Sequence, residues 1–435
     1  MNFKVIGAGL AGVESVWYIA NLGYDVTLTE MKPVKFSPAH KNEDFAELVC
    51  SNSLKALRIE SAAGLLKEEM SHFGSICVEA AKKCAVAAGG ALAVDRDMFA
   101  KTITEKIKSH PKIHIEYKEE TEIIADENNI VIVATGPLTD GTLAENIKAL
   151  TGNYLNFYDA AAPIISADSV DTDIVFGASR YDRGGESDYL NCPFNKEEYE
   201  RFHEELINAE SAPLKEFDKQ PDVYEGCMPI EIMAKRGKDT IRFGPLKPVG
   251  LRDPRTGHRP WAAVQLRHEN ADGTMFNIVG FQTNLKFGEQ KRVFSMIPGL
   301  KNAEFIRYGV MHRNSFINSP KLLNKDYSLK SNDHIFFAVQ ITGVEGYMES
   351  ASSGILAAVN AVKKANGEEP LVLPITTMMG ALTNYISDET VVNFQPMGAN
   401  FGILPSIEPH IRDKKERYKA LAQRGLDDLE KVIKQ

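Results

Sequence analysis

Short apolar runs separated by glycine-rich turns open the chain and predict a nucleotide-binding unit. Residues 3–6 form an apolar strand, residues 7–12 have the sequence Gly-Ala-Gly-Leu-Ala-Gly, and helical periodicity then continues to about residue 22. A second apolar strand, 25–29, ends at Glu30. A strand, a GxGxxG turn, a helix and a second strand that ends in an acid predict, in this order, a Rossmann dinucleotide-binding unit.

The glycines of this turn have distinct physical roles. Gly7 permits the tight turn, Gly9 lets a pyrophosphate approach the backbone N–H groups, and Gly12 allows close helix–strand packing. The positive end of the helix favours phosphate, and Glu30 can accept hydrogen bonds from an adenosine ribose. The cofactor contacts predicted here are Gly7, Ala8, Gly9, Leu10, Ala11, Gly12 and Glu30.

Two later strands indicate FAD rather than another dinucleotide. The strand 129–133 leads into Ala-Thr-Gly at 134–136, which resembles the second FAD signature of flavoproteins that bind two dinucleotides. The strand 335–339 leads into the turn 342–347 and a helix of small residues, 349–361. In such flavoproteins this last strand returns to the N-terminal domain, and its helix points its positive end at the flavin. An ordinary strand–turn–helix crossover is the alternative. The predicted contacts are Ala134, Thr135, Gly136, Gly343 and Gly346.

These elements predict an α/β fold in which a glutathione-reductase-like, FAD-binding Rossmann domain is discontinuous and carries an inserted α+β domain. We assign residues 1–153 and 307–435 to the FAD-binding domain and 154–306 to a substrate-facing insertion. Within the insertion, runs at 261–266 and 275–281 predict an antiparallel sheet, and the Pro- and Gly-rich stretch 245–260 predicts a loop. The tail, 413–434, predicts an amphipathic helix whose packing face is Tyr418, Leu421, Leu429 and Val432.

Composition narrows the class of protein. The 435 residues are 43% hydrophobic and 25% charged, no apolar run approaches the roughly 18 residues of a membrane span, and no signal peptide is recognisable. The five cysteines lack a disulfide or metal-ligand spacing, so we expect a reducing compartment, the cytoplasm, and no metal. The stretch 235–330 has 18 Lys and Arg against 7 Asp and Glu, while the whole chain carries −9. Such a basic stretch suits a polyanion, although a solvated surface explains it equally well.

Two cysteines stand in unusual settings. Cys50 precedes a segment that we interpret as a helix beginning near Leu54, and a thiol at a helix N-terminus has a depressed pKa. We therefore predict partial thiolate at neutral pH, with a buried inert cysteine as the alternative. No second cysteine lies nearby, which excludes a dithiol relay. Cys227 lies on a turn before Met228-Pro229, close to several basic residues, and its pattern leaves packing and nucleophilic roles equally open. The remaining cysteines, which we interpret as structural, are Cys77, Cys84 and Cys192.

Specific motifs along essentially the whole chain resemble one known family. They include VIGAGLAG, FAELVCSNSL, AGGALAVDR, FYDAAAPI, EGCMPIE, FGPLKPVGL, NIVGFQTNLKFG, RYGVMHRN and TGVEGY, in this order. With them the chain closely resembles the folate- and FAD-dependent tRNA (uracil-5-)-methyltransferases. The related flavoproteins that modify wobble uridine share the fold and a sequence like FQTNL, but they are longer and lack this pattern.

The resemblance implies a reaction. The one-carbon unit of 5,10-methylenetetrahydrofolate would pass to uridine C5 in RNA and be reduced to methyl, giving 5-methyluridine, with FAD as cofactor and NADH or NADPH as reductant. The T-loop uridine of tRNA is the first expectation and a ribosomal-RNA uridine the alternative. By motif, Cys227 resembles the nucleophile that adds to uracil C6, Cys50 the cysteine on the flavin side, and Tyr347 the ring beside the flavin. A small-molecule flavin oxidoreductase and a non-catalytic RNA-binding protein are competing hypotheses.

Further positions are weaker candidates. Asp95-Arg96 resembles a flavoprotein motif, with a structural ion pair as the alternative. Val339 stands where the family usually has glycine, and Lys55 where arginine is frequent. The candidates for contact with RNA phosphate, folate or the site are Arg252, Arg255, Arg259, Arg267, Asn284, Lys286, His312 and Arg313.

Overall fold

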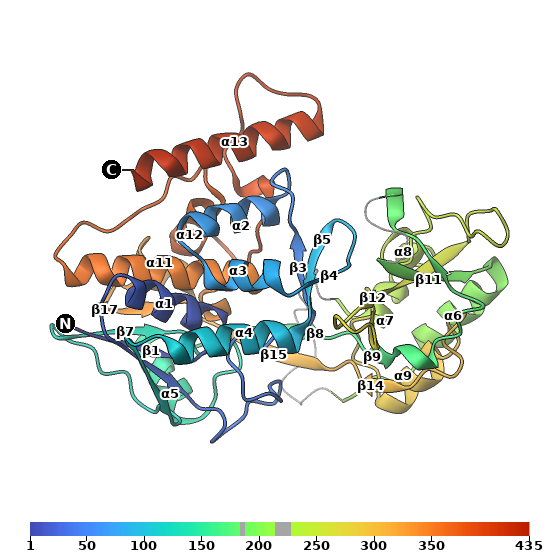
Figure 1. Ribbon diagram of the computed structural model, residues 1–435, viewed down its shortest axis with the longest axis horizontal. Coiled ribbons are helices and arrows are strands. Elements are labelled where there is room, and N and C mark those ends of the chain that lie inside the picture. The colour runs from blue at the N-terminus through green and yellow to red at the C-terminus, as the bar shows by residue number, and fades with distance from the viewer. Residues whose placement is uncertain (183–187, 214–227, 435) are drawn as a thin grey trace.

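Two six-stranded sheets organise the chain, and each has its own hydrophobic core (Figure 1). The structure is a computed structural model that describes residues 1–182, 188–213 and 228–434. The first sheet has the order β16-β17-β7-β1-β2-β6 and is parallel apart from β16. Its strands are β1 (Asn2–Ile6), β2 (Val26–Glu30), β6 (Ile113–Tyr117), β7 (Asn129–Val133), β16 (Ser328–Leu329) and β17 (Asn332–Phe337).

The C-terminal part of the chain completes this first sheet. Strand β17 pairs in parallel with β7, with Ile335 opposite Val131 and Phe337 opposite Val133. Because β17 follows β7 by about two hundred residues, the sheet is assembled from the two ends of the chain, as predicted. Strand β7, in the middle of this sheet, is an almost continuous apolar run, as expected for a strand that is covered on both faces.

Two helices with small residues pack closely against each other beside this sheet. Helix α1 (Leu10–Asn21) lies against α11 (Tyr347–Ala365), as Figure 1 shows. A Cβ on Gly354 would overlap the carbonyl oxygen of Ala11, so glycine is required at this crossing. Ser15 Oγ donates to Gly354 O at 2.9 Å. The other helices of this unit are α2 (Ala62–His72), α3 (Ile76–Lys83), α4 (Arg96–Ser109), α5 (Gly141–Thr151), α10 (Ser319–Leu322), α12 (Met378–Ser387) and α13 (Lys414–Ile433).

The inserted unit is built on an antiparallel sheet of order β10-β11-β12-β13-β9-β14, which confirms the sheet predicted there. Its core contains the aromatic side chains of Phe194, Phe202, Phe281 and Phe294. Its strands are β9 (Ile164–Ser166), β10 (Phe176–Gly177), β11 (Tyr189–Phe194), β12 (Ala262–His268), β13 (Met275–Ile278) and β14 (Phe305–Arg307). Its helices are α6 (Lys196–Asn208), α7 (Ile230–Lys235), α8 (Thr240–Phe243) and α9 (Phe287–Phe294).

A two-stranded ribbon lies between the two sheets (Figure 1). Strand β8 (Leu155–Ala160) enters the inserted unit, and β15 (Met311–Phe316) returns from it. The two strands pair antiparallel over their whole length, from Leu155 opposite Phe316 to Ala160 opposite Met311. Both connections therefore run side by side. The predicted boundary at 153/154 falls just before β8, whereas the one at 306/307 falls inside β14, so Arg307 belongs to the inserted sheet and not to the FAD-binding domain.

The prediction of a helix that begins near Leu54 is wrong. Residues Ser53–Ala56 form strand β3, which pairs antiparallel with β5 (Ala91–Val94) in a three-stranded sheet completed by β4 (Ala85–Val86). Lys55 has φ 63°, which interrupts a regular backbone conformation. The next helix, α2, begins only at Ala62, where the Ser61 side chain caps Gly64 N. The partner strand, some forty residues later, therefore decides the conformation of this segment.

The predicted C-terminal helix is confirmed. Helix α13 begins after Asp413, whose side chain accepts from Glu416 N, and its buried face includes Leu421 and Leu429. Tyr418 and Val432 pack against the same core. None of the described helices combines the length and the apolar character needed to cross a membrane.

Candidate functional site

A cavity of about 400 Å³ opens at the carboxyl ends of the strands of the first sheet and reaches the ribbon strand β8. Ligands of open α/β sheets bind at this edge. Segments from both ends of the chain and from the insertion contribute to its walls. The lining includes Gly7, Ala8, Gly9, Leu10, Glu30, Cys50, Ala134, Thr135, Gly136, Asp159, Gln282, Val339, Gln340, Glu345, Gly346 and Tyr347.

The glycine-rich turn fits a pyrophosphate. A Cβ on Gly7 would stand 2.6 Å from Ala134 O, and one on Gly12 would overlap Gly7 O, so the packing of the protein itself requires both glycines. A Cβ on Gly9 would meet no protein atom within 4 Å, and Gly9 lines the cavity. Helix α1 has no side-chain cap and no acid in its first turn, which leaves its N-terminal N–H groups for an anion.

Glu30, at the end of β2, stabilises this turn by accepting backbone hydrogen bonds. Its Oε2 accepts from Ala8 N at 2.7 Å, and its Oε1 accepts from Lys32 N at 2.9 Å. Each carboxylate oxygen can accept a second hydrogen bond. The side chain lines the cavity, so the remaining lone pairs suit ribose hydroxyls.

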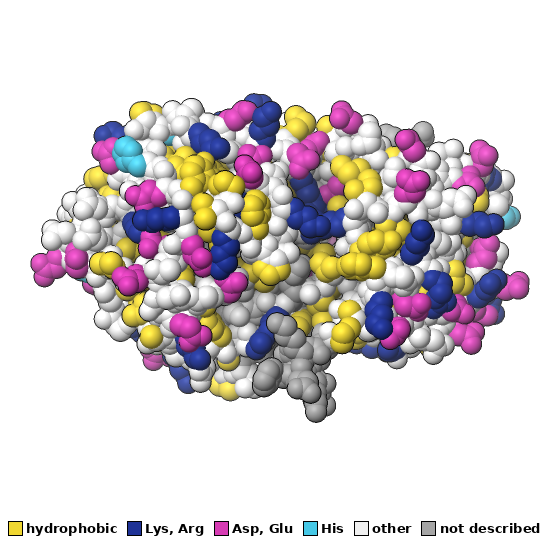
Figure 2. All heavy atoms as spheres, turned by 90° about the horizontal axis from the view of Figure 1, so that it is seen from below, with side chains coloured by type: hydrophobic (Ala, Val, Ile, Leu, Met, Phe, Trp, Pro, Cys, Tyr) yellow, Lys and Arg dark blue, Asp and Glu magenta, His cyan; other side chains and the backbone are white. Residues whose placement is uncertain are grey.

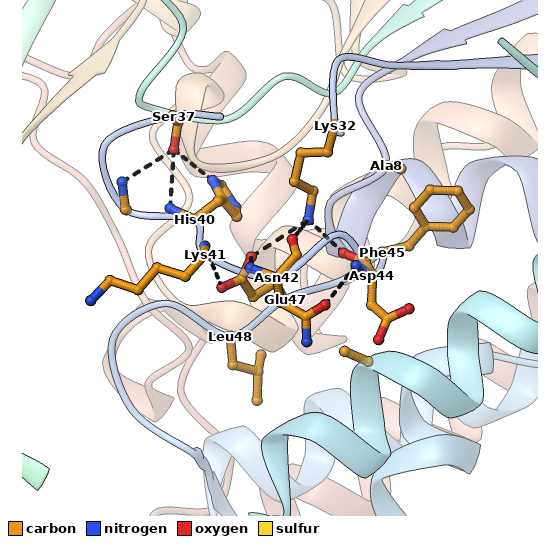
Figure 3. Close-up of polar contacts among 12 residues, drawn as sticks. Ala8, Lys32, Ser37, His40, Lys41, Asn42, Asp44, Phe45, Glu47 and Leu48 are labelled. Carbon is orange, nitrogen blue, oxygen red and sulfur yellow. Dashed lines mark hydrogen bonds and ion pairs between the residues drawn. The ribbon is translucent and has the colours of Figure 1, made fainter. Parts of the chain in front are cut away.

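Lys32 holds the segment that follows β2 in place through hydrogen bonds and an ion pair (Figure 3). Its buried ammonium donates to the carbonyl oxygens of Asn42 and Asp44 and lies 3.5 Å from Glu47 Oε2. Glu47 in turn accepts from the backbone N–H groups of Lys41, at 2.9 Å, and Asn42, at 3.2 Å. This network closes the segment after Lys32 into a compact loop, and Glu47 itself lines the cavity.

The same loop presents an imidazole to the cavity. His40 contacts Ser37 Oγ through Nδ1 at 2.6 Å, and both residues line the cavity. Burial, followed by the positive charge of Lys32, lowers the pKa of His40. The neutral form is therefore favoured here.

Cys50 and Tyr347 both line the cavity and contact each other, although nearly three hundred residues separate them in the sequence. The Tyr347 hydroxyl accepts from Cys50 N at 2.7 Å and from Ser51 N at 3.2 Å. The Cys50 thiol points to Ala160 O, with Sγ and the oxygen 3.7 Å apart. Tyr347 begins helix α11 directly after Gly346, whose φ of 119° is natural only for glycine. The fold thus brings together two side chains that the motifs assigned to the flavin.

The predicted thiolate character of Cys50 is wrong for the protein without ligands. Cys50 precedes a strand, so the helix on which the prediction of a low thiol pKa depended does not exist. Burial raises the pKa of the thiol, and the carboxylate of Asp159 raises it further, while Arg96 and Arg307 lower it in part. The thiol is therefore protonated at neutral pH.

Two carboxyl groups in the cavity were not predicted as site residues. Asp159 lies on β8, and Glu345 lies in the turn before α11. Burial, followed by the charge of Asp159, raises the pKa of Glu345 to about 8, against a hydrogen bond from Gln340 Nε2. A carboxyl with such a pKa can take or give a proton near neutrality. An acid inside the apolar run FYDAAAPI was a usable signal in the sequence.

Cys227 lies outside the described residues, but its described neighbours are anchored at the cavity. Ile230 N donates to Gln282 O at 2.7 Å, and Gln282 lines the cavity. Glu231 is buried and accepts from Thr283 Oγ1 at 2.9 Å and from Asn284 N at 2.8 Å. Helix α7 therefore starts against residues 282–284, of which Gln282 lines the cavity.

The other candidates lie apart from the cavity wall. Arg252, Arg255 and Arg259 are exposed on the loop before β12, where Arg255 forms an ion pair with Asp253 at 2.7 Å. Lys286 is exposed and pairs with Glu210, and Asn284 Nδ2 donates to Ala212 O at 3.2 Å.

Several predicted contacts prove to be internal. Arg267 is buried and donates to Asn52 Oδ1, so it offers no phosphate contact. Arg96 forms an ion pair with Glu269 rather than with Asp95. A Cβ on Gly343 would overlap the ring of Phe394, which explains this glycine without a cofactor.

The ribbon holds the last two candidates. His312 and Arg313 lie on β15, opposite Asp159 and Tyr158. The structure describes only the backbone of His312, and the Arg313 side chain is exposed.

Known proteins with similar sequences cover the whole chain. A family model described as glucose inhibited division protein A matches residues 2–369. A relative from Enterococcus faecalis, methylenetetrahydrofolate--tRNA-(uracil-5-)-methyltransferase TrmFO, is 57% identical over 430 residues, which are 99% of this chain and 98% of the relative. The chain belongs to the TrmFO family. A TrmFO relative from Acetivibrio thermocellus is likewise 57% identical, over 431 residues that are 99% of this chain and 98% of the relative.

Membership of the TrmFO family confirms the resemblance predicted from the motifs. The crystal structure of Aquifex aeolicus GidA has a TM-score of 0.70 to this chain at 16% sequence identity, and the match covers 100% of this chain and 75% of GidA. This likeness shows a shared fold, and with the family model it confirms the predicted FAD-binding Rossmann class.

Proposed function

We propose that the protein transfers the one-carbon unit of 5,10-methylenetetrahydrofolate to uridine C5 in the T-loop of tRNA and reduces it to methyl, with FAD as cofactor and NADH or NADPH as reductant. It would act in the cytoplasm, where tRNA is available. One observation carries the proposal: full-length TrmFO relatives share more than half of their residues with a chain whose cavity joins a dinucleotide turn to Cys50 and Tyr347. The reaction produces 5-methyluridine.

The residues present fit FAD. The open face at Gly9 and the N-terminus of α1 would hold the pyrophosphate, and the free lone pairs of Glu30 would take the ribose. The N-terminal end of α11, at Gly346 and Tyr347, would face the flavin ring with its positive dipole. When bound, FAD supplies the two electrons that turn a carbon at the formaldehyde oxidation level into a methyl group.

The cysteines provide the remaining chemistry in this proposal. Uracil C5 is a poor nucleophile until a thiolate adds to C6, and we assign this addition to Cys227, in the EGCMPIE motif. The anchoring of Ile230 to Gln282 supports delivery of this segment to the cavity. Cys50, whose backbone N–H is held by the Tyr347 hydroxyl, is assigned to the flavin side. Its raised pKa suits a group that stays protonated until the substrate is in place.

Exposed cations of the inserted unit and of the ribbon are proposed to hold the RNA backbone. Figure 2 shows Lys and Arg side chains gathered with hydrophobic ones near the middle of one face. We assign phosphate contacts to the exposed residues Arg252, Arg255, Arg259, Lys286 and Arg313. Each released counterion would steepen the fall of affinity with salt. His312 and Asn284 are proposed to lie beside the substrate.

Transfer of labelled methylene from folate to an unmodified tRNA transcript, followed by mapping of the product base, tests this function. Cys227→Ala should abolish labelling and retain FAD, whereas Cys192→Ala, at a buried core cysteine of the same unit, should keep activity. Full labelling by Cys227→Ala would refute the nucleophile. If the label enters only ribosomal RNA, the substrate is ribosomal RNA and not tRNA. Nicotinamide oxidation without any labelled RNA would favour a flavin oxidoreductase.

A further inference from the structure

Three arginines from separate elements converge on the segment that carries Cys50. Arg96 begins helix α4 of the FAD-binding unit, whereas Arg267 lies on β12 and Arg307 on β14 of the inserted sheet. All three donate to residues 48–52. The proposed reaction assigns no role to any of them.

The contacts follow the segment residue by residue. Arg96 donates to Leu48 O at 2.7 Å and to Cys50 O at 3.0 Å. Arg307 donates to the carbonyl oxygen between them, that of Val49. Three consecutive carbonyl groups therefore accept from guanidinium groups, which are the stronger donors in proteins.

The C-terminal side of the segment is fastened to the inserted sheet as well. Arg267 donates to Ser51 Oγ at 3.1 Å and to Asn52 Oδ1 at 2.7 Å. Asn52 is fully buried, and its Nδ2 donates to Val94 O and to His268 O, both at 3.0 Å. The amide of Asn52 thus joins β5 of one unit to β12 of the other.

The three guanidinium groups share one acidic neighbour, the buried side chain of Glu269. Within residues 1–182, 188–213 and 228–434, Arg96 pairs with Glu269, whereas Arg267 and Arg307 form no ion pair. Burying a charge without a counter-charge is unfavourable unless its donors are satisfied by hydrogen bonds. Here the Glu269 carboxylate offsets part of the positive charge of all three arginines, and neutral oxygens of the Cys50 segment accept hydrogen bonds from their remaining donors, so the charges and the position of the segment depend on each other.

We propose that Arg307 is a positioning residue for Cys50, which couples the placement of the thiol in the cavity to the docking of the inserted sheet. This proposal rests on the assignment of Cys50 to the flavin side. Tyr347 fixes the N–H of Cys50 from the FAD-binding unit, and Arg307 fixes the preceding carbonyl from the inserted unit. A shift of the inserted sheet on binding RNA would therefore move the thiol relative to Tyr347.

The test compares Arg307→Met, Arg307→Lys and the matched control Arg292→Met in the full-length protein loaded with FAD. Arg292 belongs to the same unit, is exposed and pairs with Glu205 and Glu289. Hydrogen–deuterium exchange of peptides over residues 46–53 reports on the segment directly. For Arg307→Met we expect about tenfold faster exchange of these peptides, because the segment loses one hydrogen bond from a charged donor. We also expect about tenfold lower kcat in tRNA methylation, with KM for tRNA within about twofold.

Arg307→Lys keeps a charged donor and should recover most of both losses, and Arg292→Met should match the wild type. Exchange over 46–53 that is unchanged in Arg307→Met overturns the proposal. Faster exchange spread evenly over both sheets also overturns it, because Arg307 would then act on overall stability. If the wild-type protein labels no RNA, the proposed function is wrong. The exchange experiment still decides the role of Arg307 in that case.

Discussion

Val339 is a β-branched residue in a backbone conformation that normally belongs to glycine. Its φ is 76° and its ψ 179°. The surrounding bonds enforce this conformation, because Val339 N donates to Ser353 Oγ at 2.7 Å and Val339 O accepts from Thr342 Oγ1 at 2.8 Å. The glycine usual in the family at this position is thus explained by the backbone, and the valine stores strain beside the cavity.

Two substitutions separate this strain from the packing of the side chain. Val339 is buried, so Val339→Ala should lose about 1.5 kcal/mol of apolar burial and keep the strain. Val339→Gly loses slightly more burial but relieves a strain of about 1–3 kcal/mol. At an ordinary position glycine is less stable than alanine by about 0.5–1 kcal/mol. Here we expect the opposite order, with the glycine variant more stable than the alanine variant by about 1 kcal/mol.

Urea denaturation of the three proteins without FAD measures this difference, since a bound ligand would shift all the midpoints. Equal slopes of free energy against urea should accompany the changed midpoints. An alanine variant that is as stable as the glycine variant, or more stable, refutes the strain argument. FAD titration of both variants checks that the cavity is retained.

Two further predictions concern the walls of the cavity. Gly9→Ala should leave the stability of the FAD-free protein within about 0.5 kcal/mol, since its methyl group meets no protein atom, but it should sharply reduce FAD retention. The control Gly12→Ala should destabilise the fold itself, because its methyl group would overlap Gly7 O. If Gly9→Ala retains as much FAD as the wild type, the assignment of Gly9 to the pyrophosphate is wrong. Because burial raises the pKa of Cys50, its alkylation by iodoacetamide without FAD should rise about tenfold per pH unit between pH 7 and 9. A rate that is already level at pH 7, by mass spectrometry of the Cys50 peptide, would show a thiolate instead.

Local chemistry made part of the site predictable. The GxGxxG turn, Glu30 and the Ala-Thr-Gly strand end could be identified because each depends on neighbours within a few residues: a glycine for a turn, a strand of apolar residues, an acid at its end. The antiparallel inserted sheet and the C-terminal helix were predictable for the same reason. Hydrophobic periodicity alone distinguishes these elements.

The conformation around Cys50 depended on distant residues. Ser53–Ala56 became a strand because β5 pairs with it, and this removed the helix on which a low thiol pKa was predicted. The chain alone determined a dinucleotide-binding turn and its family, since these are written in contiguous motifs. Only the tertiary structure decided the proton affinity of Cys50 and the convergence of Arg96, Arg267 and Arg307 on its segment. Burial and long-range hydrogen bonds are properties of the assembled sheets, and no local pattern encodes them.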